Sequence, residues 1–183
     1  MRTWGVENVP ERGGVLLAAN HQSFLDPPAV GLALRRQVYY VARASLFRVP
    51  LLGWFLRKQH GVPIERDAAD LSAIRMAIDL LRRGEGLVLF PEGTRTSDGS
   101  VGEFRPGFAI VAARARAPIV PVAIDGAFEA WPRGQRLPRS GRVRVAYGQP
   151  VEPLGSGKEA CVATAREVHR RVVALLDGLR QRE

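Results

Sequence analysis

Residues 15–26 have the sequence VLLAANHQSFLD, in which five apolar residues are followed by a polar stretch that ends in an aspartate. An apolar run of this length with a polar stop predicts a buried strand over Val15–Ala19. Asp26 directly precedes two prolines, which is typical of a helix N-cap with proline in the first turn. The chain therefore predicts a strand, a loop that carries His21, and a helix that starts at Asp26.

Two interpretations of this loop remain open. The loop can fold the Asp26 carboxylate back onto the His21 imidazole, which gives a base and the group that orients it. In the plainer alternative, Asp26 is only a helix cap and His21 is a loop residue hydrogen-bonded to backbone. A histidine and an aspartate five residues apart are weak evidence alone. Other motifs are needed to choose between the two.

The composition is that of one globular domain. The chain has 183 residues, of which 46% are hydrophobic and 25% are charged, enough for one domain with a buried core. No apolar run approaches the roughly 20 residues that cross a bilayer, and residues 1–4 lack the apolar core of a signal peptide. A single cysteine, Cys161, excludes an internal disulfide and fits a reducing cytoplasm. We therefore expect a single domain over residues 1–183 in the cytoplasm.

The charge balance indicates anionic partners. The chain carries 27 lysine and arginine residues against 18 aspartate and glutamate residues, which gives a net charge of +9. An excess of this size favours nucleic acid, phosphorylated metabolites or an acidic membrane surface. Arginine also grips phosphate with two donors at once. Charge alone does not choose among these three partners.

Apolar runs alternate with helical patterns along the whole chain, which predicts an α/β layered domain. The predicted strands are Val15–Ala19, Gln37–Ala42, Gly61–Ile64, Gly86–Phe90, Ile119–Ile124 and Val143–Tyr147. The predicted helices are Asp26–Arg35, Asp67–Arg83, Phe108–Arg116 and about Gly157–Leu179. No internal repeat and no linker long enough to separate domains interrupts this pattern.

The segment Leu46–Lys58 is apolar and aromatic, is flanked by basic residues, and is too short to span a bilayer. Such a segment can lie in the lipid headgroup region, or it can form a buried helix packed under the active site. Pro50 and Gly53 predict two short helical pieces rather than one continuous amphipathic helix.

A second polar loop follows another apolar strand. Residues 90–96 have the sequence FPEGTRT and come directly after Gly86–Leu89. Ligands of open α/β sheets bind outside the carboxyl ends of the strands, so this loop and His21 face one cleft if their strands are neighbours. The loop offers the carboxylate of Glu92, the hydroxyl of Thr94 and the guanidinium of Arg95, which are the parts of a site for phosphate and hydroxyl groups.

A third strand end delivers another arginine. Gly61–Ile64 is followed by Glu65, Arg66 and Asp67. Two interpretations of Arg66 remain open. Considered by itself, Arg66 is typical of a surface arginine paired with Glu65 or Asp67. Considered together with Arg95, it is one of two arginines at strand ends of one sheet, and such a pair can clamp a phosphate dianion.

Together these segments resemble the ordered blocks of the glycerolipid acyltransferase family, in particular the 1-acylglycerol-3-phosphate acyltransferases. The four blocks are Asn20–Asp26, Gly61–Arg66, Phe90–Arg95 and Ile119–Pro121, and the resemblance covers about residues 5–150. It implies a mixed central sheet flanked by helices, with a groove for the acyl chain. It also implies that His21 is the base and Asp26 its partner. The residues implied to line the acceptor site are Arg66, Glu92, Gly93 and Arg95, with Thr94 in the same loop.

The activity implied by the resemblance is transfer of a fatty acyl group from a thioester, acyl-CoA or acyl carrier protein, to the free hydroxyl of 1-acylglycerol-3-phosphate, which makes phosphatidic acid. The hydroxyl must lose its proton as it attacks, and imidazole is suited to take it near neutral pH. No Gly-x-Ser-x-Gly motif is present, so we expect direct attack without an acyl-serine. We expect no metal or organic cofactor. Oxyanion donors are expected from backbone N–H groups near the His21 loop or the Pro121 strand.

Other acceptors and partners remain open. The same chemistry fits another lysophospholipid or a hydroxylated lipid, and the arginines of residues 133–144 can dock an acidic acyl carrier protein. A basic protein that binds nucleic acid is the remote alternative, because no recognition helix, zinc motif or aromatic-basic motif is present; we therefore expect no nucleic-acid partner.

Two features depart from the family pattern. Family members usually carry an apolar N-terminal anchor, so this chain either binds the membrane through Leu46–Lys58 and surface arginines or lacks its anchor here. We expect a peripheral protein on the inner face of the cell membrane. Arg43 and Arg105 stand where the family often has lysine, and arginine differs from lysine in how it binds phosphate.

Overall fold

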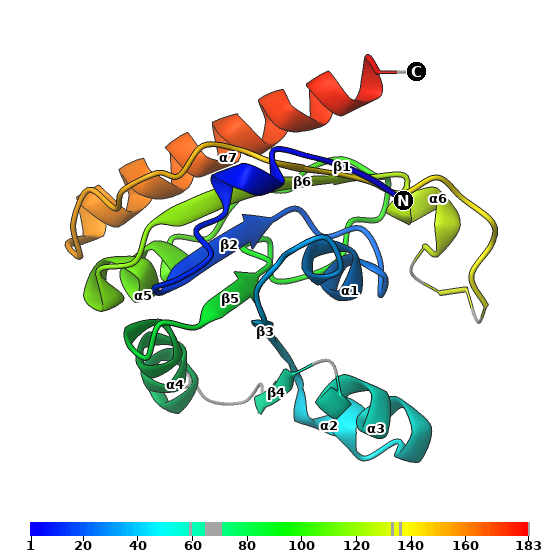
Figure 1. Cartoon of the computed structure of the whole chain (residues 1–183), viewed down its shortest axis with the longest axis horizontal. Coiled ribbons are helices and arrows are strands. Elements are labelled where there is room, and N and C mark those ends of the chain that lie inside the picture. Colours follow the sequence, from blue (N-terminus) through cyan, green and yellow to red (C-terminus); the bar gives the residue numbers. More distant parts are fainter. Residues whose placement is uncertain (59, 65–70, 133, 136, 183) are drawn as a thin grey trace.

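The fold is built on a mixed β-sheet (Figure 1). The structure is a computed structural model, and it describes residues 1–58, 60–64, 71–132, 134–135 and 137–182. Within these residues the sheet has seven strands in the order β1-β7-β6-β2-β5-β3-β4. Neighbouring strands are parallel, except that β6 and β7 are antiparallel. The strands are β1 Arg2–Trp4, β2 Val15–Ala19, β3 Val38–Arg43, β4 Gly61–Ile64, β5 Gly86–Leu89, β6 Ile119–Asp125 and β7 Arg144–Tyr147.

Strand β2 lies at the centre of the sheet, and this position explains why all of its residues are apolar. It pairs in parallel with β5 on one side and with β6 on the other, and all five of its residues are fully buried. Leu16 and Ala18 belong to the core on one face, whereas Val15, Leu17 and Ala19 belong to the core on the opposite face. A strand covered on both faces has no polar side, and each buried leucine contributes about 1.5–3 kcal/mol.

Helices cover both faces of the sheet. Helices α4, α5 and α7 supply apolar side chains to the core that contains Leu16, and Figure 1 shows α7 lying along the sheet over β6. Helices α1 to α3 and α6 contribute to the core that contains Leu17. The helices are η1 Val6–Asn8, a 3-10 turn, α1 Asp26–Gly31, α2 Ala44–Phe47, α3 Pro50–Lys58, α4 Leu71–Arg82, α5 Gly107–Ala115, α6 Ala127–Ala130 and α7 Lys158–Arg180.

The predicted elements agree with the structure in type and differ mainly at their ends. The predicted α/β class with a mixed, helix-flanked sheet is confirmed. The first helix is shorter than predicted and ends at Gly31 rather than Arg35, where Leu34 donates a backbone hydrogen bond to Gly31 in a turn. Of the helix predicted to begin at Asp67, residues 67–70 lie outside the described residues. Strand β1 and helix α6 were not predicted, since each is too short to show a period.

The α2–α3 segment agrees with the prediction of two short helices. Pro50 is the first residue of α3, where its missing N–H leaves no bond unmade. Gly53 lies inside α3, so the boundary between the two helices falls just before Pro50 and not at Gly53. It is glycine because a Cβ there would sit 2.3 Å from the carbonyl oxygen of Phe47, so the glycine allows α3 to pack closely on α2.

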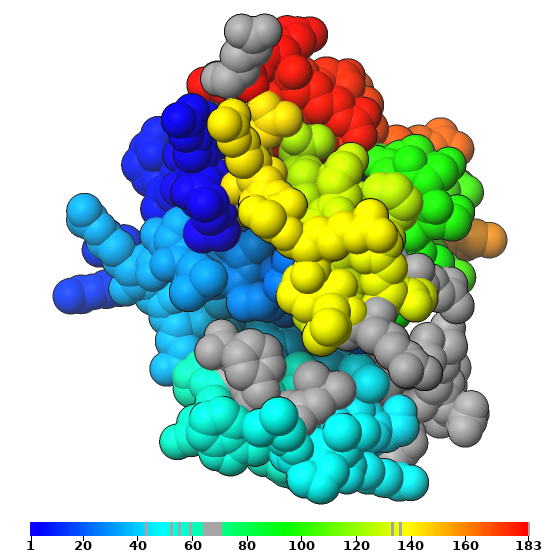
Figure 2. Space-filling model, turned by 90° about the vertical axis from the view of Figure 1, so that its right-hand side faces the viewer, coloured from blue at the N-terminus to red at the C-terminus, as the bar shows by residue number. Residues whose placement is uncertain are grey.

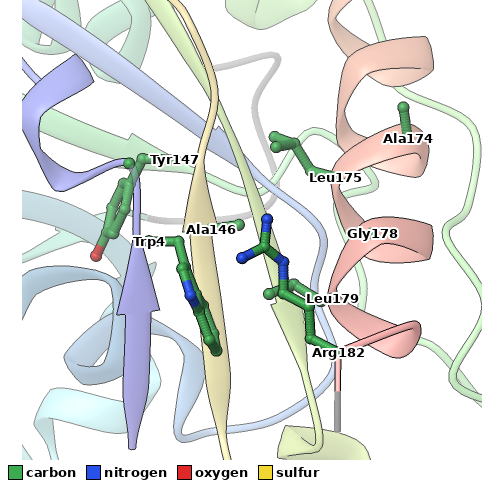
Figure 3. Close-up of a pocket in the computed structure, with 9 residues that line it drawn as sticks. Trp4, Ala146, Tyr147, Ala174, Leu175, Gly178, Leu179 and Arg182 are labelled. Atoms are coloured by element: carbon green, nitrogen blue, oxygen red, sulfur yellow. The ribbon is translucent and has the colours of Figure 1, made fainter.

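A cavity of about 350 Å³ lies between β1, β7 and α7 (Figure 3). Its walls are mostly apolar, and the guanidinium of Arg182 lies 5.4 Å from the ring centre of Trp4 at its side. None of its lining residues comes from the His21 loop or from residues 90–96, so this cavity is separate from the site described next.

Candidate active site

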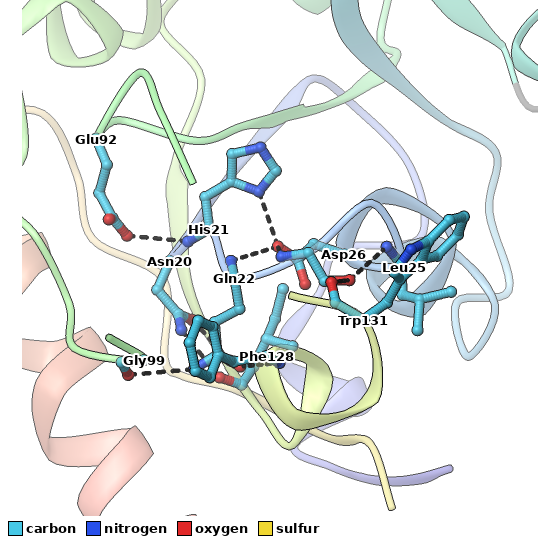
Figure 4. Close-up of polar contacts among 11 residues, drawn as sticks. Asn20, His21, Gln22, Leu25, Asp26, Glu92, Gly99, Phe128 and Trp131 are labelled. Atoms are coloured by element: carbon cyan, nitrogen blue, oxygen red, sulfur yellow. Dashed lines mark hydrogen bonds and ion pairs between the residues drawn. The ribbon is translucent and has the colours of Figure 1, made fainter. Parts of the chain in front are cut away.

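Two buried amide side chains fix the start of the loop that carries His21. Asn20 donates from Nδ2 to the Ile124 carbonyl at 2.9 Å and accepts the Ile124 N–H at Oδ1 at 2.7 Å. Gln22 donates to the Gly99 carbonyl and accepts the Phe128 N–H (Figure 4). Asn20 thereby continues the pairing of β2 with β6 one residue beyond the strand. Sequence reasoning gave neither amide a role, because a polar residue at a strand end is also typical of solvent exposure.

The loop folds Asp26 back onto His21. The Nδ1 atom of His21 lies 2.7 Å from Oδ2 of Asp26 (Figure 4). The histidine side chain is 20% exposed and the aspartate is fully buried. Oδ2 also accepts the backbone N–H groups of Gln22 at 2.6 Å and Ser23 at 2.7 Å. With Nδ1 committed to Asp26, Nε2 is the ring nitrogen left for a substrate.

The prediction that Asp26 caps helix α1 is wrong. The N-cap residue is Leu25, and no side chain caps this helix end. The carboxylate instead turns toward the preceding residues and binds their N–H groups, so it organises the loop rather than the helix. The two prolines do occupy the first turn, as predicted.

Burial raises the pKa of Asp26 above its ordinary value of 3.8, and the hydrogen bonds from His21, Ser23 and Gln22 oppose this shift. Within the described residues, the second oxygen, Oδ1, is buried and accepts no hydrogen bond. A carboxylate in such a poorly solvated position attracts a nearby cation strongly. It is therefore placed to stabilise His21 when the imidazole becomes positively charged.

The imidazole plane is held by an aromatic ring. Phe90 stacks on His21 with ring centres 4.1 Å apart and an angle of 19° between the planes. Phe90 directly follows β5, and β5 pairs with β2, so two neighbouring strands bring the rings together. The sequence contained Phe90 in its second polar loop, but no pattern in the sequence indicated which aromatic residue would stack on the histidine.

Glu92 ties the two loops together. Its Oε1 atom accepts the backbone N–H of His21 at 2.9 Å, and the His21 carbonyl accepts the N–H of Thr96 at 2.8 Å. Glu92 is buried, and this burial raises its pKa above the ordinary value of 4.5, while hydrogen bonds from the backbone of His21 and Gly102 oppose the shift. Glu92 lies against the backbone of the loop that carries His21, so its carboxylate helps to position this histidine.

Replacement of Glu92 by glutamine tests this burial. Because the folded protein binds the Glu92 proton more tightly than the unfolded chain, the free energy of unfolding falls as the pH rises through the interval just above 4.5. Glu92→Gln keeps an oxygen for the His21 N–H and removes the titration. At acid pH, Glu92 of the parent is protonated in both the folded and the unfolded state. As the pH rises to neutral, urea unfolding should show the free energy of unfolding of the variant increasing relative to that of the parent. If the difference in free energy of unfolding between Glu92→Gln and the parent did not change with pH, the pKa of Glu92 would not be raised by folding.

The guanidinium of Arg95 packs over the ring of Phe24, which serves as an aromatic platform. Its guanidinium carbon lies 3.7 Å from the ring centre of Phe24, and Phe24 packs at 5.6 Å against Trp131, which follows α6. Gly93 and Thr94, the neighbouring residues of the loop, are exposed. The structure therefore brings the His21 pair and the residues 92–95 to one edge of the sheet. Arg66 lies outside the described residues, so its predicted place beside Arg95 stays a prediction.

The guanidinium of Arg105 approaches the same loop. A side chain at Gly93 would begin 3.5 Å from it, and the Arg105 N–H donates to the Pro91 carbonyl. Gly93 has a positive φ of 72°, which glycine adopts without strain. A residue with a side chain at this position would have a strained backbone, and its Cβ would be in van der Waals contact with Arg105.

The backbone donors closest to His21 are already used. The N–H groups of His21, Gln22 and Ser23 all donate to carboxylates. These three N–H groups are therefore not available to an oxyanion, and the other oxyanion donors expected from the sequence stay a prediction.

Among the residues described, no three histidine, cysteine, aspartate or glutamate side chains lie together in a group that could hold a metal ion. Over the same residues, no helix combines the length and the apolar character needed to cross a membrane.

Comparison with known proteins defines the class. Residues 1–125 match the family model described as Acyltransferase, and the chain belongs to this family. The chain is 30% identical over 186 residues to a 1-acyl-sn-glycerol-3-phosphate acyltransferase of Bacillus subtilis, with 99% of this chain and 90% of that protein covered. It is also 30% identical to the Pseudomonas aeruginosa protein of that name, over 85% of this chain and 61% of the relative.

A solved structure shows the same architecture. The crystal structure of the 1-acyl-sn-glycerophosphate (LPA) acyltransferase PlsC from Thermotoga maritima superimposes with a TM-score of 0.85 at 30% identity. The match covers all of this chain and 73% of that one. The sequence matches and the structural match thus agree on the family and the fold.

Proposed function

We propose that this chain transfers a fatty acyl group from an acyl thioester, acyl-CoA or acyl carrier protein, to the free hydroxyl of 1-acylglycerol-3-phosphate and so makes phosphatidic acid. The observation that carries the proposal is the 2.7 Å contact of His21 Nδ1 with Asp26, beside a loop that carries Arg95. Relatives that cover nearly the whole chain are named for this activity. The acceptor and the product are both lipids, so the protein is expected to act peripherally at the inner face of the cell membrane.

His21 acts as the general base in this proposal. Its Nε2 atom takes the proton of the acceptor hydroxyl while the hydroxyl oxygen attacks the thioester carbonyl carbon. Asp26 stabilises the imidazolium that forms, because it is an unsolvated carboxylate in direct contact with Nδ1. The tetrahedral intermediate then collapses, the carbon–sulfur bond breaks, and Nε2 returns its proton to the leaving thiolate. No residue of the chain needs to carry the acyl group.

The acceptor phosphate is assigned to Arg95, together with Arg66 as predicted from the sequence. A guanidinium offers two parallel donors to a phosphate, and the stack on Phe24 limits the directions in which Arg95 can point. The phosphate is bound equally in the ground state and the transition state, so this contact contributes to affinity rather than to the chemical step.

Replacement of Arg95 by alanine should raise the KM for 1-acylglycerol-3-phosphate by about tenfold or more, with a smaller effect on kcat, because a charge-assisted contact contributes about 1.5–3 kcal/mol. Phe24→Ala keeps the charge and removes the platform, so it should raise the same KM by less. Steady-state kinetics with a fixed thioester concentration measures both. If Arg95→Ala changed only the KM for the thioester, Arg95 would belong to the donor half of the site.

One assay tests the function itself. The purified chain is incubated with lipid vesicles, acyl-CoA and 1-acylglycerol-3-phosphate, and free thiol and phosphatidic acid are quantified together. We expect equal amounts of both, and a far higher KM for a monoacylglycerol, which has the hydroxyl but no phosphate. Equal rates with other lysophospholipids would identify the broader acceptor class. Thiol release that does not depend on any lipid acceptor would refute the proposal.

The remote alternative has its own test. Nucleic-acid binding driven by the +9 charge would weaken steeply with salt and would survive His21→Ala. We expect no such binding at physiological salt.

A further inference from the structure

Helices α2 and α3 present an apolar strip to solvent. Leu51 is 79% exposed, Trp54 is 57% exposed and Val49 is half exposed. The opposite side of the helix pair is packed into the core through Phe47 and Leu56. Leu51 and Trp54 are three residues apart in α3 and so lie on one side of that helix. The exposed strip is therefore the outer surface of a helix pair whose inner surface is firmly attached to the sheet.

The segment that carries this strip, residues 44–58, contains basic residues and no acidic ones. Residues 44–58 contain Arg48, Arg57 and Lys58 and no aspartate or glutamate. Arg57 lies with its guanidinium carbon 5.7 Å from the Phe47 ring centre, while Lys58 is exposed at the end of α3. Apolar and aromatic side chains surrounded by cations match the boundary between acyl chains and anionic headgroups.

The strip lies at the edge of the sheet that carries the candidate active site. Helix α2 begins directly after the carboxyl end of β3, and β3, β5 and β2 are parallel neighbours. The carboxyl ends of these strands, including the one followed by His21, thus share one edge. Figure 2 views this side of the molecule and shows the α2–α3 segment, in cyan, forming its lower end.

We propose that α2 and α3 dock the protein on an anionic lipid bilayer, with Val49, Leu51 and Trp54 in the headgroup region and the basic residues on the lipid phosphates. The docking step does not depend on the proposed function, but the delivery of a lipid acceptor to His21 rests on it. A membrane is favoured over a protein partner because exposed apolar and aromatic side chains beside basic residues complement an anionic lipid surface.

Sedimentation with vesicles tests the proposal. Vesicles of phosphatidylcholine mixed with phosphatidylglycerol are compared with vesicles of phosphatidylcholine alone. The double variant L51S/W54S should bind the anionic vesicles at least about tenfold more weakly than the parent. R57Q/K58Q should weaken binding to the anionic vesicles and leave the weak binding to neutral vesicles unchanged. Leu154, which is 70% exposed ahead of α7, provides the matched control, and Leu154→Ser should bind as the parent does.

Activity on a dispersed substrate separates docking from catalysis. With a short-chain acceptor below its micelle concentration, L51S/W54S should turn over as fast as the parent, whereas it should be slower on vesicles. Circular dichroism verifies that the variant is folded. Unchanged vesicle binding of folded L51S/W54S would overturn the proposal. If the parent were a dimer and L51S/W54S a monomer, and both bound vesicles equally, the strip would be an interface between two copies and the proposal would be overturned.

Discussion

Replacement of His21 by alanine is expected to lower kcat for acyl transfer by at least about 10²- to 10⁴-fold, the range that a positioned general base contributes. The hydroxyl of the acceptor is a weak nucleophile until a base takes its proton, and Nε2 of His21 is the nitrogen that the Asp26 contact leaves available. The KM values for acceptor and thioester should change little. The measurement is the initial rate of thiol release on vesicles that contain 1-acylglycerol-3-phosphate.

The fold should tolerate this substitution. The His21 side chain is partly exposed and contacts Phe90 and Asp26, so its loss leaves a surface hollow instead of a core cavity. Thermal unfolding of His21→Ala should therefore occur near the parent temperature. A folded variant that retains the parent rate would show that another group removes the proton.

Replacement of Asp26 by asparagine should lower kcat by up to about 10⁴-fold, the loss found when the carboxylate behind the catalytic histidine of a serine protease is neutralised. Asparagine keeps an oxygen for the N–H groups of Gln22 and Ser23, so the loop retains its shape. It carries no charge, and it therefore does not stabilise the imidazolium that forms as Nε2 takes the proton. The rate of acyl transfer and the melting temperature are measured on the same preparation.

Asp26→Ala is the comparison that separates charge from structure. Alanine removes the acceptor of three hydrogen bonds, and each buried donor left without a partner costs about 1–3 kcal/mol. We expect this variant to be both slow and clearly less stable, whereas Asp26→Asn should be slow but close to the parent in stability. If asparagine restored full activity, the charge of Asp26 would not be part of the mechanism.

The fold was largely predictable because β2 consists entirely of apolar residues. A run buried on both faces requires neighbours on both sides and helices above and below, and β5 and β6 show the same apolar character. Strand β1 was not predictable, because three residues of mixed polarity pair with β7 from the far end of the chain. That pairing depends on the completed sheet and not on any local pattern.

The site was predictable in its residue types and only partly in its geometry. Polar residues after two apolar strands indicated that His21 and the residues 92–95 share an edge. The sequence left two interpretations of Asp26 open, and its 2.7 Å contact with His21 agrees with the one in which the loop folds back. The bonds from the Gln22 and Ser23 N–H groups to the same carboxylate were not predicted. The contact of Phe24 with Trp131 joins segments far apart in sequence, and no spacing rule connects them. The burial of Glu92 follows from its bond to the His21 backbone, which exists only after both loops are in place.

The arrangement separates three tasks. Asn20 and Gln22 fix the loop backbone to the sheet and to α6, while Asp26 and Phe90 orient the imidazole. In the proposed function Arg95, whose guanidinium lies against the Phe24 ring, binds the acceptor. Substitutions in the first group should therefore affect stability and rate together, whereas substitutions of Arg95 should act on acceptor affinity.

The most direct test of the mechanism is a rapid-quench experiment that follows free thiol and phosphatidic acid at enzyme concentrations comparable to the thioester. Direct attack activated by His21 predicts no thiol release before the acceptor is added, and then the appearance of thiol and phosphatidic acid at one common rate. A burst of thiol equal to the enzyme concentration in the absence of acceptor would reveal an acylated residue and contradict the account.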